Sequence, residues 1–211
     1  MKGNIRINNK VEGLNVTVDK DENSYVITID EIKDRVELGT VSPGQLINDK
    51  YIVKGVNPDG SIRVFRKYAL PDRLKFGDKN NDWRESNHRK YLNNEYYKEI
   101  CEEFGKENIA DSVSDMLSLD GLDDYGTCVD KVNVMSIDEY RECRRKGLIK
   151  ENLDKPHSLL TPDSTPSGAG SGCVCCFGSY GYVHWARYDG ELRLRPAFSL
   201  KSTVLVSLTN D

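Results

Sequence analysis

The sequence lacks a long apolar segment and an excess of positive charge. Its 211 residues have a mean hydropathy of −0.61. No apolar run approaches the roughly 18 residues that a membrane span needs. Residues Met1–Arg6 contain no apolar stretch of the kind found in a secretory signal. The formal net charge is −4, which gives no general attraction to nucleic acid. We therefore expect a protein that is not secreted, does not enter a membrane and does not bind nucleic acid.

Motifs that mark common catalytic centres are also missing. The three histidines, His88, His157 and His184, do not occur in a zinc-protease pattern, and no Gly-x-Ser-x-Gly motif is present. The glycine-rich run Gly168–Gly172 has no phosphate-binding lysine and lies in a loop rich in Pro, Ser and Gly. Carboxylates between residues 111 and 124 are scattered, as is typical of a solvated surface. These absences predict a protein that is not an enzyme and has no cofactor.

One polar stretch has the carboxylate spacing of a calcium-binding loop. It begins with Asp19, Asp21 and Asn23, but Ser24 stands at the sixth position, where such a loop has glycine. The flanking segments also have strand character, whereas a calcium loop of this type lies between helices. A charged hairpin turn explains the same residues, and we expect no metal there.

Six cysteines are present, and three of them, Cys173, Cys175 and Cys176, are nearly adjacent. In a cytoplasm such thiols stay reduced. Together with His184 they offer soft metal ligands, but structural zinc normally takes two separated ligand pairs, and no second Cys-x-x-Cys pair exists. On a strand, Cys173 and Cys175 share one face and Cys176 takes the other. We interpret the cluster as core packing; a metal site and a redox or nucleophilic role are the alternatives.

Strand patterns lie at both ends of the chain. Runs at Asn15–Val18 and Tyr25–Ile29 predict a hairpin. A second hairpin is predicted from Tyr51–Val56 and Ser61–Phe65, which flank the turn sequence Asn57–Gly60. After a loop at 161–172, further strands are predicted at Cys173–Phe177, Tyr182–Tyr188, Glu191–Leu194 and Phe198–Val206.

Helical patterns occupy the middle of the chain. We expect one helix from about Glu95, with Asn94 as its N-cap and Gly105 as its end. A second helix begins after Ser136, whose spacing to Glu139 predicts a capping box, and it ends near Gly147. A third, short helix is predicted over Glu85–Leu92. A break at 38–44 divides the chain into an N-terminal β-hairpin extension, residues 1–37, and a main domain, residues 38–211.

Four short motifs follow one another in a particular order. They are Trp83-x-x-Ser86-x-x-Arg89 with Asn93, Asp130-Lys131-Val132 with Glu139-Tyr140 after it, Thr161-Pro162, and Gly190 followed by Arg195-Pro196-Ala197. In this order and spacing, the chain resembles an uncharacterised domain family found in phage and prophage proteins of Gram-positive gut bacteria. Two positions depart from the usual family pattern, because Tyr91 and His157–Leu160 stand where that family has tryptophan.

This resemblance implies a fold. The family is similar to C-type-lectin-like proteins, which include formylglycine-generating enzymes and the variable proteins of diversity-generating retroelements. We therefore expect an α+β, C-type-lectin-like domain with an antiparallel sheet, two main helices and long loops, over residues 38–206. Sharing a general fold transfers no catalysis. The lack of a secretory signal and of a membrane span predicts a cytoplasmic location. With the resemblance, this becomes the cytoplasm of the bacterial host, or the virion after assembly.

Two motif residues carry structural expectations. Trp83 is predicted to be buried and to anchor the helix that follows it, with a structural role instead of a ligand-binding one. Pro196 has no backbone N–H to donate to a neighbouring strand, so it is predicted at a sheet edge or a bulge.

An aromatic segment near the C-terminus is the candidate binding surface. It combines Tyr, Trp and Arg with Gly and Ser, which is typical of recognition surfaces. Alternation places Val183, Trp185 and Arg187 on one side of a strand and the remaining aromatic residues on the other. The loop Ser164–Ser171 is expected beside this surface. The predicted contact residues are Tyr180, Tyr182, His184, Arg187 and Tyr188.

The leading hypothesis is a non-catalytic phage or prophage protein that recognises a protein or glycan partner through this surface, with a virion-associated role as one form of it. One alternative is an intracellular phage inhibitor that binds a host defence protein. The other is a cysteine-dependent enzyme or metalloprotein. The sequence leaves the partner and the oligomeric state open.

Overall fold

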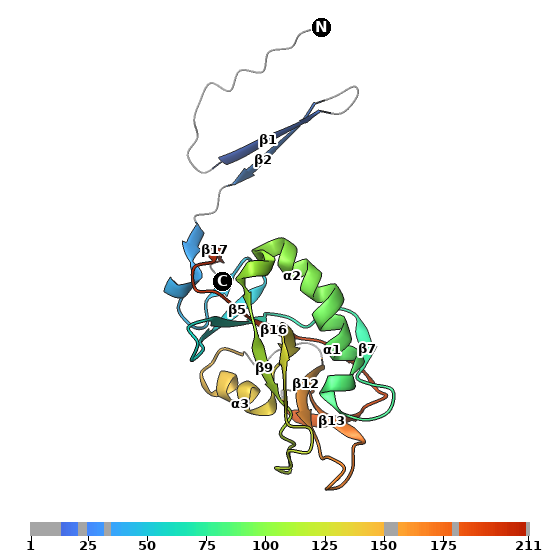
Figure 1. The fold of residues 1–211 in the computed structure, drawn as a ribbon. Helices are drawn as coiled ribbons and strands as arrows, with labels where there is room; N and C mark the ends of the chain where they lie inside the picture. Colours follow the sequence, from blue (N-terminus) through green and yellow to red (C-terminus); the bar gives the residue numbers. More distant parts are fainter. Residues whose placement is uncertain (1–13, 21–24, 32–34, 150–155, 179–181, 210–211) are drawn as a thin grey trace.

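The computed structural model describes residues 14–20, 25–31, 35–149, 156–178 and 182–209. It is a mixed α+β structure whose α-helices come from the middle of the chain and lie on the outside of the strands (Figure 1). The first two strands, β1 (Leu14–Lys20) and β2 (Tyr25–Glu31), pair antiparallel in a sheet of their own. The predicted N-terminal hairpin is therefore confirmed, while the turn that carries Asp21 and Asn23 lies outside the described residues.

The larger sheet combines the start, the middle and the end of the chain. Its order is β11-β16-β6-β5-β4-β17-β3, with β8 paired beside β16, and all of these pairings are antiparallel. In chain order the strands are β3 (Arg35–Glu37), β4 (Leu46–Ile47), β5 (Tyr51–Val56), β6 (Ile62–Arg66), β8 (Ile109–Ala110), β11 (Val132–Val134), β16 (Pro196–Leu200) and β17 (Leu205–Thr209). The predicted hairpin around Asn57–Gly60 is confirmed as β5 and β6. Because β3 pairs with β17, residues 35–37 join this sheet; the division of the chain at residue 37 stays a prediction.

A second sheet has five strands in the order β14-β13-β12-β15-β7. They are β7 (Arg73–Lys75), β12 (His157–Pro162), β13 (Cys173–Phe177), β14 (Val183–Arg187) and β15 (Glu191–Arg193). The pairing of β12 with β15 is parallel and the other pairings are antiparallel. A separate two-stranded ribbon is formed by β9 (Ser112–Asp115) and β10 (Thr127–Asp130).

The central helix is longer than predicted. It runs through α1 (Asn87–Tyr91), a π-helical turn (Leu92–Tyr96) and α2 (Tyr97–Phe104) without a break. Ser86 is the N-cap, and its hydroxyl accepts a hydrogen bond from the Arg89 amide. The prediction of an Asn94 cap was wrong, because Asn94 lies inside this helix and donates to the Lys90 carbonyl. Gly105 ends the helix with φ of 82°, as predicted.

The second helix, α3 (Ile137–Arg145), begins as the sequence predicts. Ser136 accepts a hydrogen bond from the Glu139 amide at 3.1 Å, and Gly147 follows the C-terminus with φ of 70°. Only half of the predicted capping box is made, because the Glu139 carboxylate accepts hydrogen bonds from Arg63. The Arg63 guanidinium thus fixes the start of α3 against β6.

Two clusters of buried side chains lie on opposite faces of the strands that separate them. The first core cluster includes Trp83, Tyr96 and Phe198. The second core cluster includes Phe65, Tyr140, Phe177 and Cys175. Successive residues of β13 alternate between the two, because Val174 and Cys176 belong to the first cluster and Cys175 and Phe177 to the second. Strand β13 is therefore buried on both faces.

Pro196 does not lie where the sequence reasoning put it. It is the first residue of β16, an interior strand between β11 and β6, and it is opposite Val134. The expectation of an edge or a bulge was wrong, because the first position of a strand also tolerates a residue without an N–H donor. Arg195, just before it, is buried and donates to the carbonyls of Arg66 and Lys67.

Candidate functional site

Strand β14 forms one end of the five-stranded sheet. Among the described residues it pairs only with β13, from Cys173 opposite Arg187 to Phe177 opposite Val183. Tyr182 is 51% exposed and Trp185 is 57% exposed, and His184 and Arg187 are also exposed. The structure therefore places four aromatic or cationic side chains on one solvent-facing edge. We call Tyr182, His184, Trp185 and Arg187 the β14 face.

Three rings of the β14 face form a row. The ring centroids of Tyr182 and His184 are 5.8 Å apart, and those of His184 and Trp185 are 5.7 Å apart. These distances are within the range in which aromatic rings attract one another. The rings are tilted by 44° and 50° relative to one another, so the row is a stepped aromatic surface with polar atoms at the Tyr and His rings.

The imidazole of His184 also covers the strand edge. Tyr188 donates to Gly172, and Tyr182 accepts from Gly178, so even-numbered residues turn their backbone groups toward β13. Trp185 therefore points its backbone groups outward. His184 Nδ1 lies 2.8 Å from Trp185 N and 2.9 Å from Trp185 O. Covering an edge amide in this way hinders the addition of another strand.

The remaining predicted contact residues have different environments. Arg187 is ion-paired with Asp189, with Nε 3.0 Å from Oδ1, and its guanidinium lies 5.7 Å from the centre of the Tyr188 ring. Tyr188 is only partly exposed and packs against the first core cluster. It therefore belongs to the base of the face. Tyr180 lies outside the described residues.

The exposure of β14 differs from the predicted alternation. Ala186 packs against the first core cluster and Val183 against the second, so each side of the strand has one inward position. Trp185 is exposed although it was not among the predicted contacts. Its exposure depends on β14 being an end strand, which the order of residues along the chain does not reveal.

The loop 164–171 is attached to the body of the protein. Ser164 donates to Asp120 and accepts from the Ala169 amide, and the Ser167 amide donates to Asp124. Thr165 is fully buried. The loop leads into β13 at the end where Cys173 is opposite Arg187. It therefore lies nearer to Arg187 than to Tyr182, and these bonds limit how far it can adapt to a partner.

The cysteine cluster is packed in the core, as the leading interpretation expected for Cys175 and Cys176. Burial raises the pKa of the Cys175 thiol to about 12 and that of Cys176 to about 11. Cys173 is half-buried, and burial also raises its pKa. Thiols with raised pKa values form little thiolate near neutral pH, which disfavours nucleophilic chemistry. Within the described part of the chain, no three His, Cys, Asp or Glu side chains gather as a metal-binding group.

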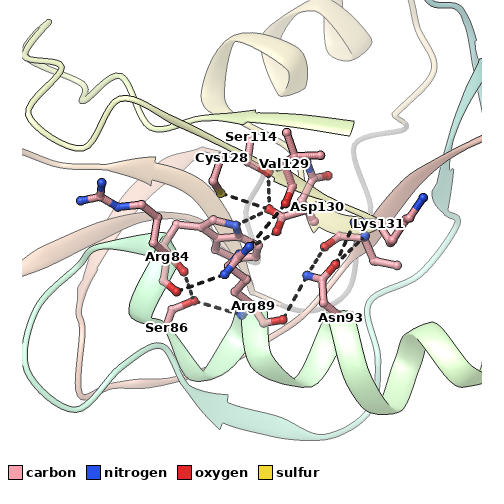
Figure 2. Close-up of polar contacts among 12 residues, drawn as sticks. Arg84, Ser86, Arg89, Asn93, Ser114, Cys128, Val129, Asp130 and Lys131 are labelled. Atoms are coloured by element: carbon pink, nitrogen blue, oxygen red, sulfur yellow. Dashed lines mark hydrogen bonds and ion pairs between the residues drawn. The ribbon is translucent and has the colours of Figure 1, made fainter. Parts of the chain in front are cut away.

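A second polar centre forms around Asp130, where two of the sequence motifs meet (Figure 2). The Asp130 side chain has no exposed surface. Trp83 Nε1 donates to its Oδ2 at 2.8 Å, and Ser114 Oγ donates to the same oxygen at 2.6 Å. Arg89 Nε donates to Oδ1 at 2.6 Å. The buried carboxylate is thus paired with a cation and hydrogen-bonded on both oxygens, which a buried charge requires.

Other motif residues extend this centre. Asn93 Oδ1 accepts from the amides of Lys131 and Val132, and Asn93 Nδ2 donates to the Val132 carbonyl. Asn133 donates to Ser114 and accepts from Arg63, which in turn binds Glu139. We call this chain of contacts the Asp130 network. It links the central helix, the ribbon β9–β10 and the helix α3.

The Asp130 network explains the role of Trp83. Trp83 is fully buried, as predicted, and its ring lies 6.3 Å from that of Phe76. Neither its ring nor its indole N–H is accessible to a partner. The burial of Trp83 was predicted correctly, but its contact with Asp130 was not, because an aspartate 47 residues away gives no local signal of that contact.

Comparison with known proteins adds no relative. No protein-family model, no curated protein and no solved structure matches the chain. Among the helices described above, none has both the length and the apolar character needed to cross a bilayer.

Proposed function

We propose that this protein is a non-catalytic binding protein that recognises a protein or glycan partner through the β14 face. The observation that carries the proposal is the row of three rings on one exposed strand edge, with Trp185 57% exposed and Tyr182 51% exposed. Tyr, Trp and Arg supply most of the binding energy in typical interfaces, because they offer large contact areas with few rotatable bonds.

The recognition is by side chains. The outward amide of Trp185 is occupied by His184, so the strand edge is a poor template for a partner's strand. The rings are exposed above this edge, and the Arg187 guanidinium, which is ion-paired with Asp189, lies on the same strand. Exposed aromatic rings of this kind suit a sugar ring or a protein patch that packs against them.

In this proposal the main body is a C-type-lectin-like domain of a phage or prophage protein, with a role in the virion as one form. The support for the fold is its mixed α+β composition with curled, mostly antiparallel sheets and two main helices. The support for a phage origin is the sequence resemblance. The raised pKa values of the cysteines favour this binding role over a cysteine-dependent enzyme.

The test is site-specific photo-crosslinking. A photoreactive amino acid replaces Trp185 in one preparation and Tyr68, which is 56% exposed on a different part of the surface, in another. Each is irradiated with immobilised cell-wall glycans and, separately, with lysate of a Gram-positive bacterium. The proposal expects a specific adduct from position 185 and none from position 68.

The identity of the adduct separates the forms of the proposal. A glycan or an envelope protein supports the lectin-like role, and a cytoplasmic defence protein supports the inhibitor role. Equal crosslinking from both positions, or none from position 185, contradicts recognition through the β14 face.

A further inference from the structure

The ribbon β9–β10 carries an apolar pair that faces solvent. Val113 and Val129 are directly opposite each other in its register. They are 69% and 59% exposed, whereas Ser114 and Asp130, the next residues along each strand, are buried. Alternation thus gives the ribbon an inner polar face and an outer face with an exposed valine pair. No strand or helix among the described residues covers that pair.

This ribbon is held firmly in place. Asp130 and Ser114 of its inner face belong to the Asp130 network, which ties them to Trp83, Arg89 and Asn133. A surface fixed in this way loses little conformational freedom on binding, so more of its contact energy is kept. The exposed pair is therefore presented on a rigid support.

A hollow lies on the β9 side of the valine pair. Its volume is about 400 Å³, and its lining includes Val113, Asp59 and the pair Arg63–Glu139. Arg63 Nε is 2.9 Å from Glu139 Oε1, so those two charges balance. Asp59 is exposed, and within the described residues its carboxylate accepts hydrogen bonds from the Ser61 amide and hydroxyl and forms no ion pair. This side of the ribbon carries unbalanced negative charge.

A second hollow lies on the β10 side. Its volume is about 380 Å³, and its lining includes Val129, Lys90, Arg89 and Lys131. Asp130 balances Arg89, and Asp111 balances Lys131 at 2.7 Å. Lys90 is exposed and stands outside both of these pairs. This side of the ribbon carries unbalanced positive charge.

We infer that the outer face of the β9–β10 ribbon is the surface through which two copies of this chain associate. A two-fold axis that passes through the valine pair and runs parallel to the two strands brings Val113 of one copy against Val129 of the other. The same rotation places the hollow with Lys90 of each copy against the hollow with Asp59 of its partner. A surface with an apolar centre and opposite charges on its two sides is complementary to a second copy of the same surface. Association of two copies also buries all four valines. This inference does not depend on the β14 face.

Sedimentation velocity over a concentration series from about 1 μM to about 1 mM tests the inference. The wild-type protein is expected to show a reversible monomer–dimer equilibrium within that range. The double variant Val113→Thr/Val129→Thr keeps side-chain shape and β-branching but adds hydroxyls to the centre of the interface. We expect its dimer to dissociate about tenfold more readily. Leu205→Thr, at a position 54% exposed on β17, is the matched control and is expected to behave as wild type.

Charge reversal gives an independent arm. Lys90→Glu is expected to weaken the dimer about tenfold. Lys98→Glu, a change of an exposed lysine on the same helix, is expected to have no effect. Asp59→Lys weakens the dimer as well, and mixing it with Lys90→Glu restores association, since each contact across the two-fold again joins opposite charges. Circular dichroism verifies that each variant is folded.

Two results overturn the inference. One is a wild-type protein that stays monomeric over the whole series. The other is a Val113→Thr/Val129→Thr variant that associates as tightly as wild type, which places any self-association on a different surface. Both results leave the proposal about the β14 face standing.

Discussion

The two tryptophans of the chain occupy opposite environments, and each belongs to a polar group of different character. Trp83 is fully buried, and its indole N–H donates to a carboxylate that is itself buried. Trp185 is 57% exposed on the end strand of a sheet, and its ring contacts the exposed ring of His184. The first group, the Asp130 network, joins three structural elements. The second, the β14 face, lies on an end strand that pairs with β13 alone among the described residues.

This difference separates stability from recognition. In the Asp130 network each polar atom that is lost leaves a buried partner unsatisfied, so substitution there reduces the free energy of unfolding. On the β14 face the side chains are exposed, so water replaces the contacts that a substitution removes. Substitution there therefore leaves the fold intact and changes only binding. Variants of the Asp130 network and of the β14 face, compared in the same stability and binding assays, test whether the two properties are separate.

The largest effect is expected for Trp83→Ala. Truncation opens a cavity in the first core cluster and removes a donor to Asp130, and such a change costs about 3–5 kcal/mol of the free energy of unfolding. Chemical denaturation followed by tryptophan fluorescence and circular dichroism measures it. Trp185→Ala is the matched control and is expected to leave the midpoint nearly unchanged. Comparable losses for the two variants would break the separation.

The next effect concerns the ion pair inside the network. Arg89→Ala leaves Asp130 buried without its cation, and we expect a loss of about 3 kcal/mol. Arg141→Ala removes an exposed arginine of α3 that pairs with the exposed Asp138, and we expect a loss of less than about 1 kcal/mol. Denaturation midpoints of both variants are measured at neutral pH. If Arg89→Ala costs no more than Arg141→Ala, the network does not stabilise the fold as described.

A smaller, pH-dependent effect is expected from His88, which lies in the first turn of the central helix and is fully buried. Burial lowers its pKa from 6.5 to about 4. The unfolded chain therefore binds the proton more readily, and stability falls as the pH decreases from about 6.5 toward 4. Between pH 7 and pH 5 we expect this residue to account for a loss of about 2 kcal/mol.

His88→Gln identifies this contribution. Glutamine keeps a donor for the Leu74 carbonyl, which His88 Nε2 contacts at 2.8 Å, but it does not titrate. Denaturation at a series of pH values should show a flatter dependence in this variant than in wild type. An unchanged slope would assign the acid sensitivity to other groups.

Local features of the fold were predictable from the sequence. The turn Asn57–Gly60, the N-cap Ser136 and the helix end at Gly105 were identified because each depends on residues a few positions apart. The prediction of Asn94 as an N-cap was wrong because it too was based only on neighbouring residues. Both Ser86 and Asn94 have side chains that suit an N-cap, and only the packing of residues 87–93 on the sheet decides that the helix starts earlier.

Long-range features were not predictable. The assignment of β14 as an end strand, the exposure of Trp185 and the contact between Trp83 and Asp130 all depend on how distant segments meet. For the candidate site, the sequence identified Tyr182, His184 and Arg187 as exposed polar or aromatic residues near one another. It also included Tyr188, which packs against the core, because alternation alone does not show which side of a strand is covered.

The separation of stability from recognition is tested most directly by one double variant, Tyr182→Ala/Arg187→Ala, measured for both properties. Both side chains are exposed, and neither contributes to the Asp130 network. The account predicts a denaturation midpoint and a circular dichroism spectrum equal to those of wild type, with capture of the crosslinked partner about tenfold weaker. A variant that unfolds more easily, or one that captures the partner as strongly as wild type, would contradict it.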